Sequence, residues 1–452
     1  MHVSTSEGSS PAWTSRFAFL MASIGFAVGL GNIWRFPYVT GENGGAAFVL
    51  VYLVCIFAIG VPILMAELMI GRRGRMTPPG SLRHVAKESG RSEHWQWVGV
   101  MNMSAAFLIM ITYCVVAGWV LSYLYQAVFT GFVGVDAASA TNTFDVLLSD
   151  AGGMVFWTLL ALVFTGSIIY AGLQKGIERA VVVLMPVLFI LMLGLVMYNM
   201  VVGGFKEAID YLFTADFSKI NADVMLAAIG QAFFSIGVAM AGMMTFGAYL
   251  PKEISIGKSV LIIIVADTLV ALLAGLVIFP AVFNNGLDPA GGPGLIFQTL
   301  PVAFAQMPGG HLVSVLFFLL LSVAAITSMV GLIEPLTQWL EEKKEYSRHK
   351  SAMLILGTIA SLSIFSMLGY NELSSYTIAG KDINGVVDYF SNQILLPLGG
   401  LHIAIFAGWV VDKNIAIEEL DMGEGGLFKL WHILIRFLVP PAVFIVFVLG
   451  VS

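Results

Sequence analysis

Apolar residues occur along this chain in eleven long stretches that are separated by short polar segments. Each stretch is close to the length of about 20 residues that an α-helix needs to cross a bilayer. The pattern predicts an all-α integral membrane protein with eleven transmembrane helices, near residues 16–40, 44–70, 96–126, 154–172, 178–202, 225–250, 257–283, 312–342, 351–368, 385–410 and 430–450. The connecting segments are too short for a separate soluble domain, so residues 1–452 are expected to form a single transmembrane domain.

Two of these stretches contain a run of glycine and other small residues that disfavours a continuous helix. The runs are residues 25–32 (GFAVGLGN) in the first stretch and residues 235–242 (SIGVAMAG) in the sixth. Lipid offers no hydrogen bond to an exposed N–H or C=O group, so a broken helix must be buried in protein or line a wet cavity. Two such breaks predict a binding site near the membrane midplane.

The positions of the breaks also predict an internal repeat. Spans one to five (16–202) and six to ten (225–410) can be overlaid so that a broken helix opens each half. Because five is an odd number of crossings, the second half must have the inverted topology. The stretch at 430–450 is then an additional span.

Composition and charge support a membrane protein and predict its orientation. The chain is 58% hydrophobic and 11% charged, far from the average of about 25% charged residues in soluble proteins. In an eleven-span layout, only Lys206, Lys219 and Lys381 among the loop cations fall on the side opposite the N-terminus. The positive-inside rule therefore predicts a cell-membrane protein with a cytoplasmic N-terminus and an extracellular Ser452. A net charge of −6 without a basic arm excludes nucleic acid as a partner.

Three smaller features give further expectations. Cys55 and Cys114 lie within spans and are predicted to be small buried hydrophobic residues, not a disulfide. Residues 295–306 lie between two Pro/Gly clusters, 288–294 and 308–310. They predict either a short re-entrant helical lid over an external vestibule or an ordinary surface loop.

Several motifs resemble those of one transporter family. They are GLGNIWRFP at 29–37 followed by ENGG at 42–45, KGIER at 175–179, GQAFFS at 230–235 and AAITS at 324–328. In order and spacing they resemble the signatures of the neurotransmitter:sodium symporter family, over spans one to ten. Among its members the chain is most similar to bacterial sodium-coupled transporters of hydrophobic amino acids. The resemblance implies symport of aliphatic and aromatic L-amino acids into the cell by alternating access, and no enzymatic activity.

The resemblance also implies two Na⁺ sites built mainly from neutral oxygen atoms, which suit a hard cation. One would use the carbonyl of Ala27, the side chains of Asn32, Ser235 and Asp267, and the substrate carboxylate. The other would use the carbonyls of Gly25, Val28 and Ala324 with the hydroxyls of Thr327 and Ser328. An alternative for these hydroxyls is a hydrogen bond back to the preceding helical turn.

Asp267 departs from the family pattern, which has Asn at this position. Many bacterial relatives place Glu one turn later, where chloride-dependent animal members bind Cl⁻, and this chain has Ala271 there. Asp267, near Tyr52, Gln231 and Ser235, is therefore predicted to supply the missing negative charge and to make transport chloride-independent. A structural hydrogen-bonding role is the alternative.

The expected substrate site lacks the Asp that monoamine symporters carry at the position of Gly29, so the ligand must bring its own carboxylate. That carboxylate is expected at Tyr113 and the N–H groups of the first break, and the ammonium at nearby carbonyls. Gly237 leaves volume and Met240 adapts in shape, which favours large apolar side chains. The predicted substrate-binding residues are Phe26, Ala27, Gly29, Leu30, Gly31, Ile109, Tyr113, Phe234, Ser235, Gly237, Met240, Ser328 and Leu332.

Gates are also implied by the resemblance. An external ion pair would join Arg35 to Asp388 above the aromatic lid Phe234. The cytoplasmic gate would use Trp13, Tyr249 and Glu342, but Ser10 stands where a basic residue is expected, which predicts a weaker or different pairing.

Two further assignments concern spans two and five. Gly176 and Pro186 match a spacing in which span five unwinds at its cytoplasmic end. Glu67 in span two is predicted to hydrogen-bond backbone freed by the break in span six.

Other classes of protein remain as alternatives at this stage. An intramembrane enzyme is disfavoured because the histidines lie at loops or lack a matched Ser/Asp arrangement. A channel and a non-transporting amino-acid sensor on the same scaffold are also possible. The sequence leaves open the oligomeric state, the substrate ranking, the stoichiometry and the resting conformation.

Overall fold

The computed structural model describes residues 12–289 and 294–451, and this part of the chain is helical with no β-strand. A single β-bridge pairs Ile378 with Lys381. The α-helices are α1 (Arg16–Ala27), α2 (Phe36–Glu42), α3 (Ala46–Cys55), α4 (Val61–Gly74), α5 (Pro78–Glu88), α6 (Gln96–Phe129), α7 (Ala137–Ser149), α8 (Ala151–Tyr170), α9 (Arg179–Val202), α10 (Phe205–Phe213), α11 (Ala222–Ser235), α12 (Gly242–Ala248), α13 (Ile256–Asn284), α14 (Leu300–Gln306), α15 (Gly310–Lys344), α16 (Arg348–Leu368), α17 (Ile383–Asp388), α18 (Leu396–Ile405), α19 (Lys413–Leu420), α20 (Gly426–Ile433) and α21 (Val439–Val451).

Short helical segments of other pitch join many of these helices into longer spans. The π-helical segments are η1 (Gly31–Arg35), η2 (Ile56–Gly60), η4 (Leu173–Glu178), η6 (Leu295–Thr299), η7 (Tyr389–Leu395), η8 (Phe406–Val410) and η9 (Leu434–Leu438). Two 3₁₀ turns, η3 (Glu93–Trp95) and η5 (Phe217–Lys219), complete the described part.

Each of the eleven predicted spans corresponds to a helix or a pair of helices. In the described residues, nine helices are long and apolar enough to cross a membrane. The first predicted span is a pair, Arg16–Ala27 and Gly31–Glu42, bent by 49°. The sixth is also divided, into α11 and α12, so both predicted breaks are present.

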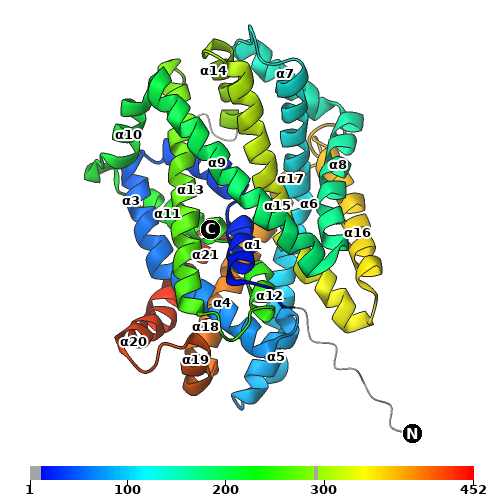
Figure 1. Cartoon of the computed structure of the whole chain (residues 1–452), viewed down its shortest axis with the longest axis vertical. Helices are drawn as coiled ribbons and strands as arrows, with labels where there is room; N and C mark the ends of the chain where they lie inside the picture. The colour runs from blue at the N-terminus through cyan, green and yellow to red at the C-terminus, as the bar shows by residue number, and fades with distance from the viewer. Residues whose placement is uncertain (1–11, 290–293, 452) are drawn as a thin grey trace.

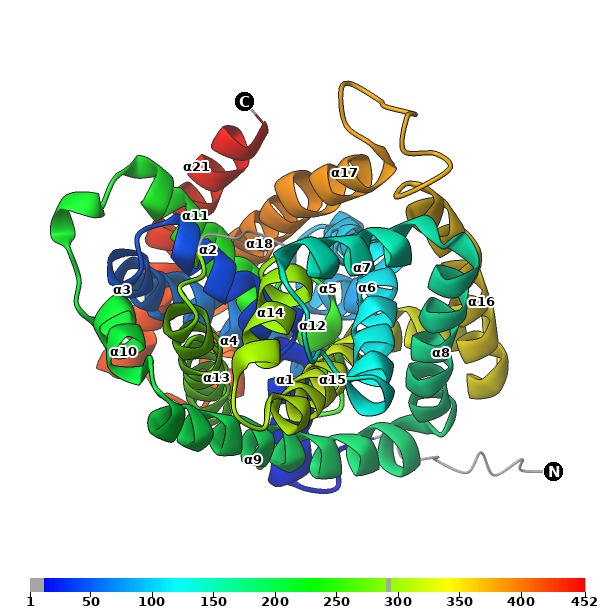
Figure 2. The same cartoon turned by 90° about the horizontal axis from the view of Figure 1, so that it is seen from above.

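The bundle places the first broken helix at its centre. Helix α1 packs against α9, α13 and α15, and α4 packs against α12 (Figures 1 and 2). The span 310–344 is buried along most of its length, whereas few residues of 426–451 are buried. Its exposed side chains are largely apolar, as expected for a helix in contact with lipid.

Residues 295–306 form a helical segment and not an irregular loop, which confirms the helical part of the lid prediction. Leu295 and Phe297 are buried, and the ring of Phe297 stacks on Phe144 at 5.3 Å between centroids. The Tyr123 hydroxyl donates to the Phe297 carbonyl at 2.9 Å. The Pro/Gly cluster before this segment lies partly outside the described residues, at 290–293.

Both cysteines are free and buried, as predicted. The Sγ atom of Cys114 lies 3.0 Å from the Ser363 hydroxyl.

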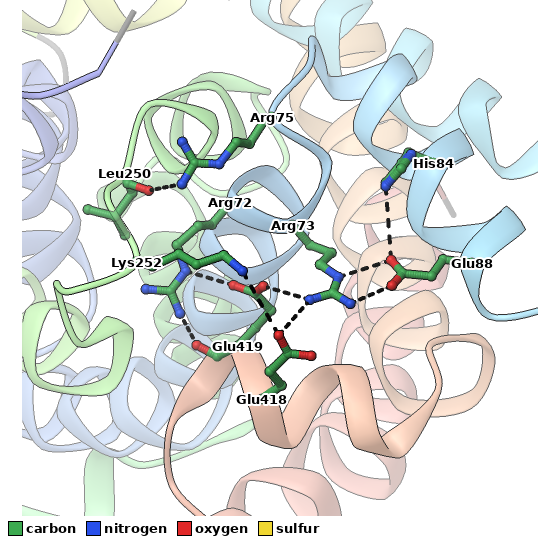
Figure 3. A network of polar contacts seen from close by, with 9 residues as sticks. All are labelled: Arg72, Arg73, Arg75, His84, Glu88, Leu250, Lys252, Glu418 and Glu419. Carbon is green, nitrogen blue, oxygen red and sulfur yellow. Dashed lines mark hydrogen bonds and ion pairs between the residues drawn. The ribbon is translucent and has the colours of Figure 1, made fainter. Parts of the chain in front are cut away.

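At one end of the bundle, α5, α19 and α20 lie together in Figure 1. This end, which carries Arg72, Arg73, Arg75 and Lys252, is called the basic face below. Figure 3 shows the ionic network that joins its helices. Arg72 of α4 bonds Glu419 of α19 at 2.7 Å, with both side chains 3% exposed, and also donates to the Ile254 carbonyl at 2.7 Å. The neighbouring Arg73 contacts Glu418 at 3.0 Å and Glu419 at 3.2 Å, and it also bonds Glu88 of α5.

The network fixes the short helix α19 to the end of α4. Hydrogen bonds from Arg73 hold the pKa of Glu88 below its ordinary value. Because α19 leads directly into the last span, the network ties that span to the central helices.

Candidate functional site

The first break begins where α1 ends at Ala27. Val28 is extended, with φ −74° and ψ 94°, and the chain becomes helical again at η1. Two N–H groups of the break bond to side chains: Leu30 donates to the Tyr113 hydroxyl at 3.1 Å, and Gly29 to Asn32 Oδ1 at 3.4 Å. The freed backbone is therefore covered by polar groups of the protein, as a break within lipid requires.

The second break spans residues 236–241. Its backbone reaches positive φ at Gly237 (65°), Ala239 (61°) and Ala241 (64°), a region that disfavours residues with a Cβ. The Ala239 N–H donates to Glu67 Oε1 at 2.8 Å, which confirms the predicted role of Glu67.

A cavity of about 30 Å³ lies between the two breaks. Its lining is Phe26, Ala27, Gly29, Gly31, Ile109, Tyr113, Phe234, Gly237, Met240, Ser328 and Leu332. All of these residues are among those predicted to bind substrate. The other two predicted residues lie nearby: Leu30 lines a larger outer cavity, and Ser235 belongs to an adjacent polar cluster.

Phe26 lies against three glycines, two of which the sequence prediction missed. A Cβ added to Gly237, Gly242 or Gly331 would come within 3.0, 2.4 or 2.1 Å of the Phe26 ring. The missing side chains make room for this ring at the inner end of the cavity. The sequence marked Gly242 as the last residue of the second glycine-rich run but not as a contact of Phe26, and Gly331 lies within an ordinary apolar helix sequence.

The first predicted sodium site corresponds to a fully buried polar cluster. Asn32, Ser235 and Asp267 are 0% exposed, and the Ser235 hydroxyl donates to Asp267 Oδ2 at 2.7 Å. Asn32 Nδ2 donates to Asp267 Oδ1 at 2.8 Å and to the Ser235 hydroxyl at 3.0 Å. Tyr52 lies 3.2 Å from Ser235 and 3.5 Å from Asp267. The structure thus brings together the predicted side chains of this site.

The second predicted site lies where α15 meets the end of α1. The Ser328 hydroxyl donates to the carbonyls of Gly25 at 3.3 Å and Phe26 at 3.2 Å. The Thr327 hydroxyl instead donates to the carbonyls of Val323 and Ala324 in its own helix, the alternative raised from the sequence. The structure therefore brings together the side chains of the first predicted site, and in the second it joins the Ser328 hydroxyl to the Gly25 carbonyl. Oxygen atoms of these kinds are ligands that a hard cation prefers.

An outer cavity of about 520 Å³ adjoins the small one, because Ile109, Tyr113 and Phe234 line both. Arg35 and Asp388 also line the outer cavity, but among the described residues they form no ion pair. Arg35 donates to Gln231 at 2.8 Å, and its guanidinium carbon lies 5.0 Å from the centre of the Phe234 ring. The predicted external ion pair is therefore not formed in this structure.

Aromatic rings close the opposite side of the small cavity. Phe246 lies 5.9 Å from Phe26 and 5.5 Å from Trp13, and Trp13 lies 6.2 Å from Tyr249. The Trp13 indole donates to the Phe246 carbonyl at 3.0 Å. Trp13 and Tyr249 were predicted as gate residues, whereas Phe246 was missed.

The polar part of this inner closure differs from the prediction. Tyr249 donates to Glu334 at 2.8 Å, and Glu334 pairs with Arg348, which also contacts Glu341 at 3.2 Å. The predicted Glu342 instead accepts the Thr77 N–H at 2.8 Å, at the start of α5. Ser10, where a basic residue was expected, lies outside the described residues.

Span five is helical where unwinding was predicted. Gly176 lies in the π-helical segment η4, and α9 continues through Pro186. A Cβ on Gly176 would come within 2.0 Å of the Ile168 carbonyl, so this glycine permits close packing on α8. The adjacent Met185 packs on Gly25, so span five lies beside the second predicted sodium site.

Comparison with known proteins gives the family. The family model described as the sodium:neurotransmitter symporter family matches residues 10–147 and 142–452. An uncharacterized sodium-dependent transporter of Haemophilus influenzae is 36% identical over 445 residues, covering 96% of this chain and 97% of the relative. The uncharacterized sodium-dependent transporter YhdH of Bacillus subtilis is 34% identical over 438 residues, covering 96% of each.

A solved structure agrees with these relatives. The crystal structure of MhsT in complex with L-phenylalanine matches with a TM-score of 0.90 and 40% sequence identity, covering 97% of this chain and 99% of MhsT. The fold, the motifs and the relatives agree: this chain belongs to the sodium:neurotransmitter symporter family and is a sodium-dependent membrane transporter.

Proposed function

We propose that this protein carries hydrophobic L-amino acids, aliphatic and aromatic, into the cell together with two Na⁺ ions and without a chloride requirement. The observation that carries the proposal is the cavity between the two broken helices, lined by backbone of the first break and by apolar side chains. Because most loop cations lie on one side of the predicted spans, we infer that the basic face and the N-terminus are cytoplasmic and that the C-terminus is extracellular.

The polar end of the cavity suits an amino-acid carboxylate. A Cβ on Gly29 would come within 2.3 Å of the Ser328 hydroxyl and 2.9 Å of the Tyr113 hydroxyl, so both groups face this glycine. The lining there carries no carboxylate to pair with a monoamine. Substrate is expected to accept hydrogen bonds from Tyr113 and from N–H groups of the break.

The apolar end determines the preferred side chains. Ile109, Phe234, Met240 and Leu332 surround the space, and MhsT, similar in fold and sequence, was crystallised with L-phenylalanine. Because the space is about 30 Å³, a large substrate requires Phe26 or Met240 to move. Met240 has three rotatable side-chain bonds and can adapt to substrates of different shape.

Sodium would share the first site with the substrate. Asn32, Ser235 and Asp267 would contribute side-chain oxygens there, the Ala27 carbonyl another, and the bound carboxylate a further ligand. Binding of substrate and of Na⁺ would then be reciprocal, each strengthening the other. Asp267 would also supply a negative charge one turn before Ala271, the position at which chloride-dependent relatives bind Cl⁻.

The second ion would bind between Gly25, Val28, Ala324, Thr327 and Ser328. The Ser328 hydroxyl already bridges the two helices, through the Gly25 carbonyl. An ion at this place would hold α1 against α15, and movement of span five at Met185 would open it toward the basic face. Gly176 and Pro186 remain our candidates for the residues that permit this movement.

Two separate closures, one on each side of the small cavity, support alternating access. The outer cavity reaches Phe234, and the rings of Trp13, Phe246 and Tyr249 close the inner side. We expect Arg35 and Asp388 to pair above Phe234 when substrate is bound. The Tyr249–Glu334–Arg348 contacts would separate when the inner side opens.

The energetics favour coupling to two ions. A zwitterionic amino acid has no net charge, so the membrane potential drives its uptake only through the accompanying cations. Each Na⁺ gains about 2.3 kcal/mol per 100 mV, so two ions supply about 4.6 kcal/mol. This energy corresponds to accumulation on the order of a thousandfold, because each 1.4 kcal/mol is about a factor of ten.

A competition panel tests the substrate class. Uptake of radiolabelled L-phenylalanine into proteoliposomes is measured against each of the twenty amino acids, with Na⁺ or K⁺ outside. We expect strong competition from Leu, Ile, Met, Tyr and Trp, and weak competition from Asp, Glu and Lys. Equal competition by charged amino acids would contradict the proposed substrate class.

A further inference from the structure

Arg436 is a cation within the last apolar span, Gly426–Val451. Its guanidinium carbon lies 3.9 Å from the centre of the Trp409 ring and 5.4 Å from that of Phe437. The Trp409 indole donates to the Arg436 carbonyl at 3.2 Å. The side chain is therefore held at the seam between η8 and η9, near the lipid-facing surface.

In the part of the chain that the structure describes, the guanidinium has no hydrogen-bond acceptor. No carboxylate lies within 4.0 Å of it, and its buried Nε has no partner. Other arginines near the bundle differ: Arg35 donates to Gln231, Arg72 to Glu419 and Arg348 to Glu334. An unpaired charge within a span is costly, so its counter-ion is expected from outside the chain.

The depth of Arg436 is set by its neighbour on span ten. Trp409 lies one residue before the end of η8, and α19 begins at Lys413. Tryptophan at the end of a span is typical of the membrane interface, where lipid phosphates lie. Arg436 contacts this Trp409, so it lies at the same level of the bilayer.

The surface around Arg436 combines charge with apolar area. Lys429 precedes it by seven residues, a spacing that places the two cations on the same helix face. Phe437 and Ile433 are 58% and 55% exposed. Gly408 permits the close approach of the spans, because a Cβ there would lie 3.0 Å from Arg436 Cα.

We propose that this seam binds the headgroup of an anionic phospholipid in the leaflet at the basic face. The Arg436 guanidinium donates to the lipid phosphate in the paired geometry that arginine favours. Lys429 adds charge nearer the water, and the acyl chains lie on Ile433 and Phe437. Trp409 holds the guanidinium in place through its ring face. Cationic pockets between spans suit such lipids.

The test uses the full chain purified in phosphatidylcholine nanodiscs, into which phosphatidylglycerol is titrated. Melting temperature and native mass spectrometry report bound lipid. We expect Arg436→Gln to bind phosphatidylglycerol about tenfold or more weakly, the loss expected for a hydrogen bond to a charged group. Arg436→Lys keeps the charge and should show an intermediate affinity. Lys258→Gln, an exposed cation at the start of α13, is the matched control and should behave like the unaltered chain.

Three outcomes would overturn the proposal. The first is equal stabilisation by phosphatidylcholine and phosphatidylglycerol. The second is an unchanged phosphatidylglycerol affinity in both Arg436 variants. The third is a loss of phosphatidylglycerol affinity in Lys258→Gln as large as that in Arg436→Gln. Displacement of the lipid by millimolar glycerol phosphate would overturn the lipid assignment in favour of a soluble phosphate site. If Arg436→Gln does not fold, the phosphatidylglycerol affinity of Arg436→Lys, compared with that of the unaltered chain, decides the proposal. Substrate and sodium binding do not enter any of these measurements.

Discussion

Asp267 is the single residue on which the proposed chloride independence depends. It is fully buried, accepts hydrogen bonds from Ser235 and Asn32, and lies one turn before Ala271. We expect Asp267→Asn to create a chloride requirement, with uptake about tenfold lower when gluconate replaces Cl⁻, a typical coupling between sites. The measurement is labelled amino-acid uptake in each anion.

The double variant Asp267→Asn/Ala271→Glu serves as its control. It restores one carboxylate a turn away and should remove the chloride requirement. Sodium-coupled uptake by Asp267→Asn that is indifferent to Cl⁻ would show that Asp267 has only a structural role.

Gly29 tests the substrate site without changing charge. A Cβ there would collide with Ser328 and Tyr113, and such overpacking costs about 1–3 kcal/mol, or about 5- to 150-fold in affinity. We therefore expect Gly29→Ala to weaken substrate binding by a factor in this range. Gly194→Ala in α9 is the matched control, because nothing lies within 4 Å of its added Cβ. Equal affinity of the two variants in a binding assay would remove Gly29 from the site.

Glycines that interrupt an apolar helix are visible in the sequence, so the two breaks were predictable from it, whereas most single site residues were expected only because the motifs resemble a known family. Ala239 and Ala241 were less visible: alanine favours a helix, yet both adopt positive φ here. Tertiary contacts such as that from Glu67 impose this conformation, and no local pattern encodes them.

At the scale of elements, the contact between α4 and the second break is the most specific. Glu67 accepts the Ala239 N–H in a fully buried position. Glu67→Ala would leave that donor unpaired and should lower stability by about 1–3 kcal/mol. Glu67→Gln keeps an acceptor oxygen and should lose less. Thermal unfolding of the purified variants compares the two losses of stability. Equal losses in Glu67→Ala and Glu67→Gln would show that the acceptor oxygen does not stabilise the second break.

The gates show where sequence reasoning stopped at this scale. Glu334 lies within α15 and Arg348 lies 14 residues later, at the start of α16, and nothing in the sequence indicates that the two side chains meet. Only the packing of α15 on α16 brings them together with Tyr249. The Arg35–Asp388 pair, in turn, depends on which conformation the bundle adopts, and one sequence supports several.

At the scale of the whole molecule, the network of Figure 3 joins the last span to the central helices. Its buried pair is Arg72–Glu419, and removing one partner leaves an uncompensated charge. We expect Glu419→Ala to destabilise the protein by about 3–5 kcal/mol. The double variant Arg72→Met/Glu419→Leu should recover much of this loss in thermal unfolding. If the stability loss of the double variant equals the sum of the losses of Arg72→Met and Glu419→Leu, the two side chains are not a coupled pair.

The arrangement of spans was predictable because lipid imposes length and hydrophobicity on every crossing helix. The roles of π-helical segments such as η4 were not predictable, because these roles depend on how closely neighbouring helices approach at positions such as Gly176.

Accumulation of labelled L-phenylalanine by proteoliposomes under an inward Na⁺ gradient tests the whole account most directly. We predict an internal concentration above the external one, lost when K⁺ replaces Na⁺ and strongly reduced in Gly29→Ala. Simple equilibration across the membrane, or accumulation that continues without Na⁺, would contradict a sodium-coupled site between the two broken helices.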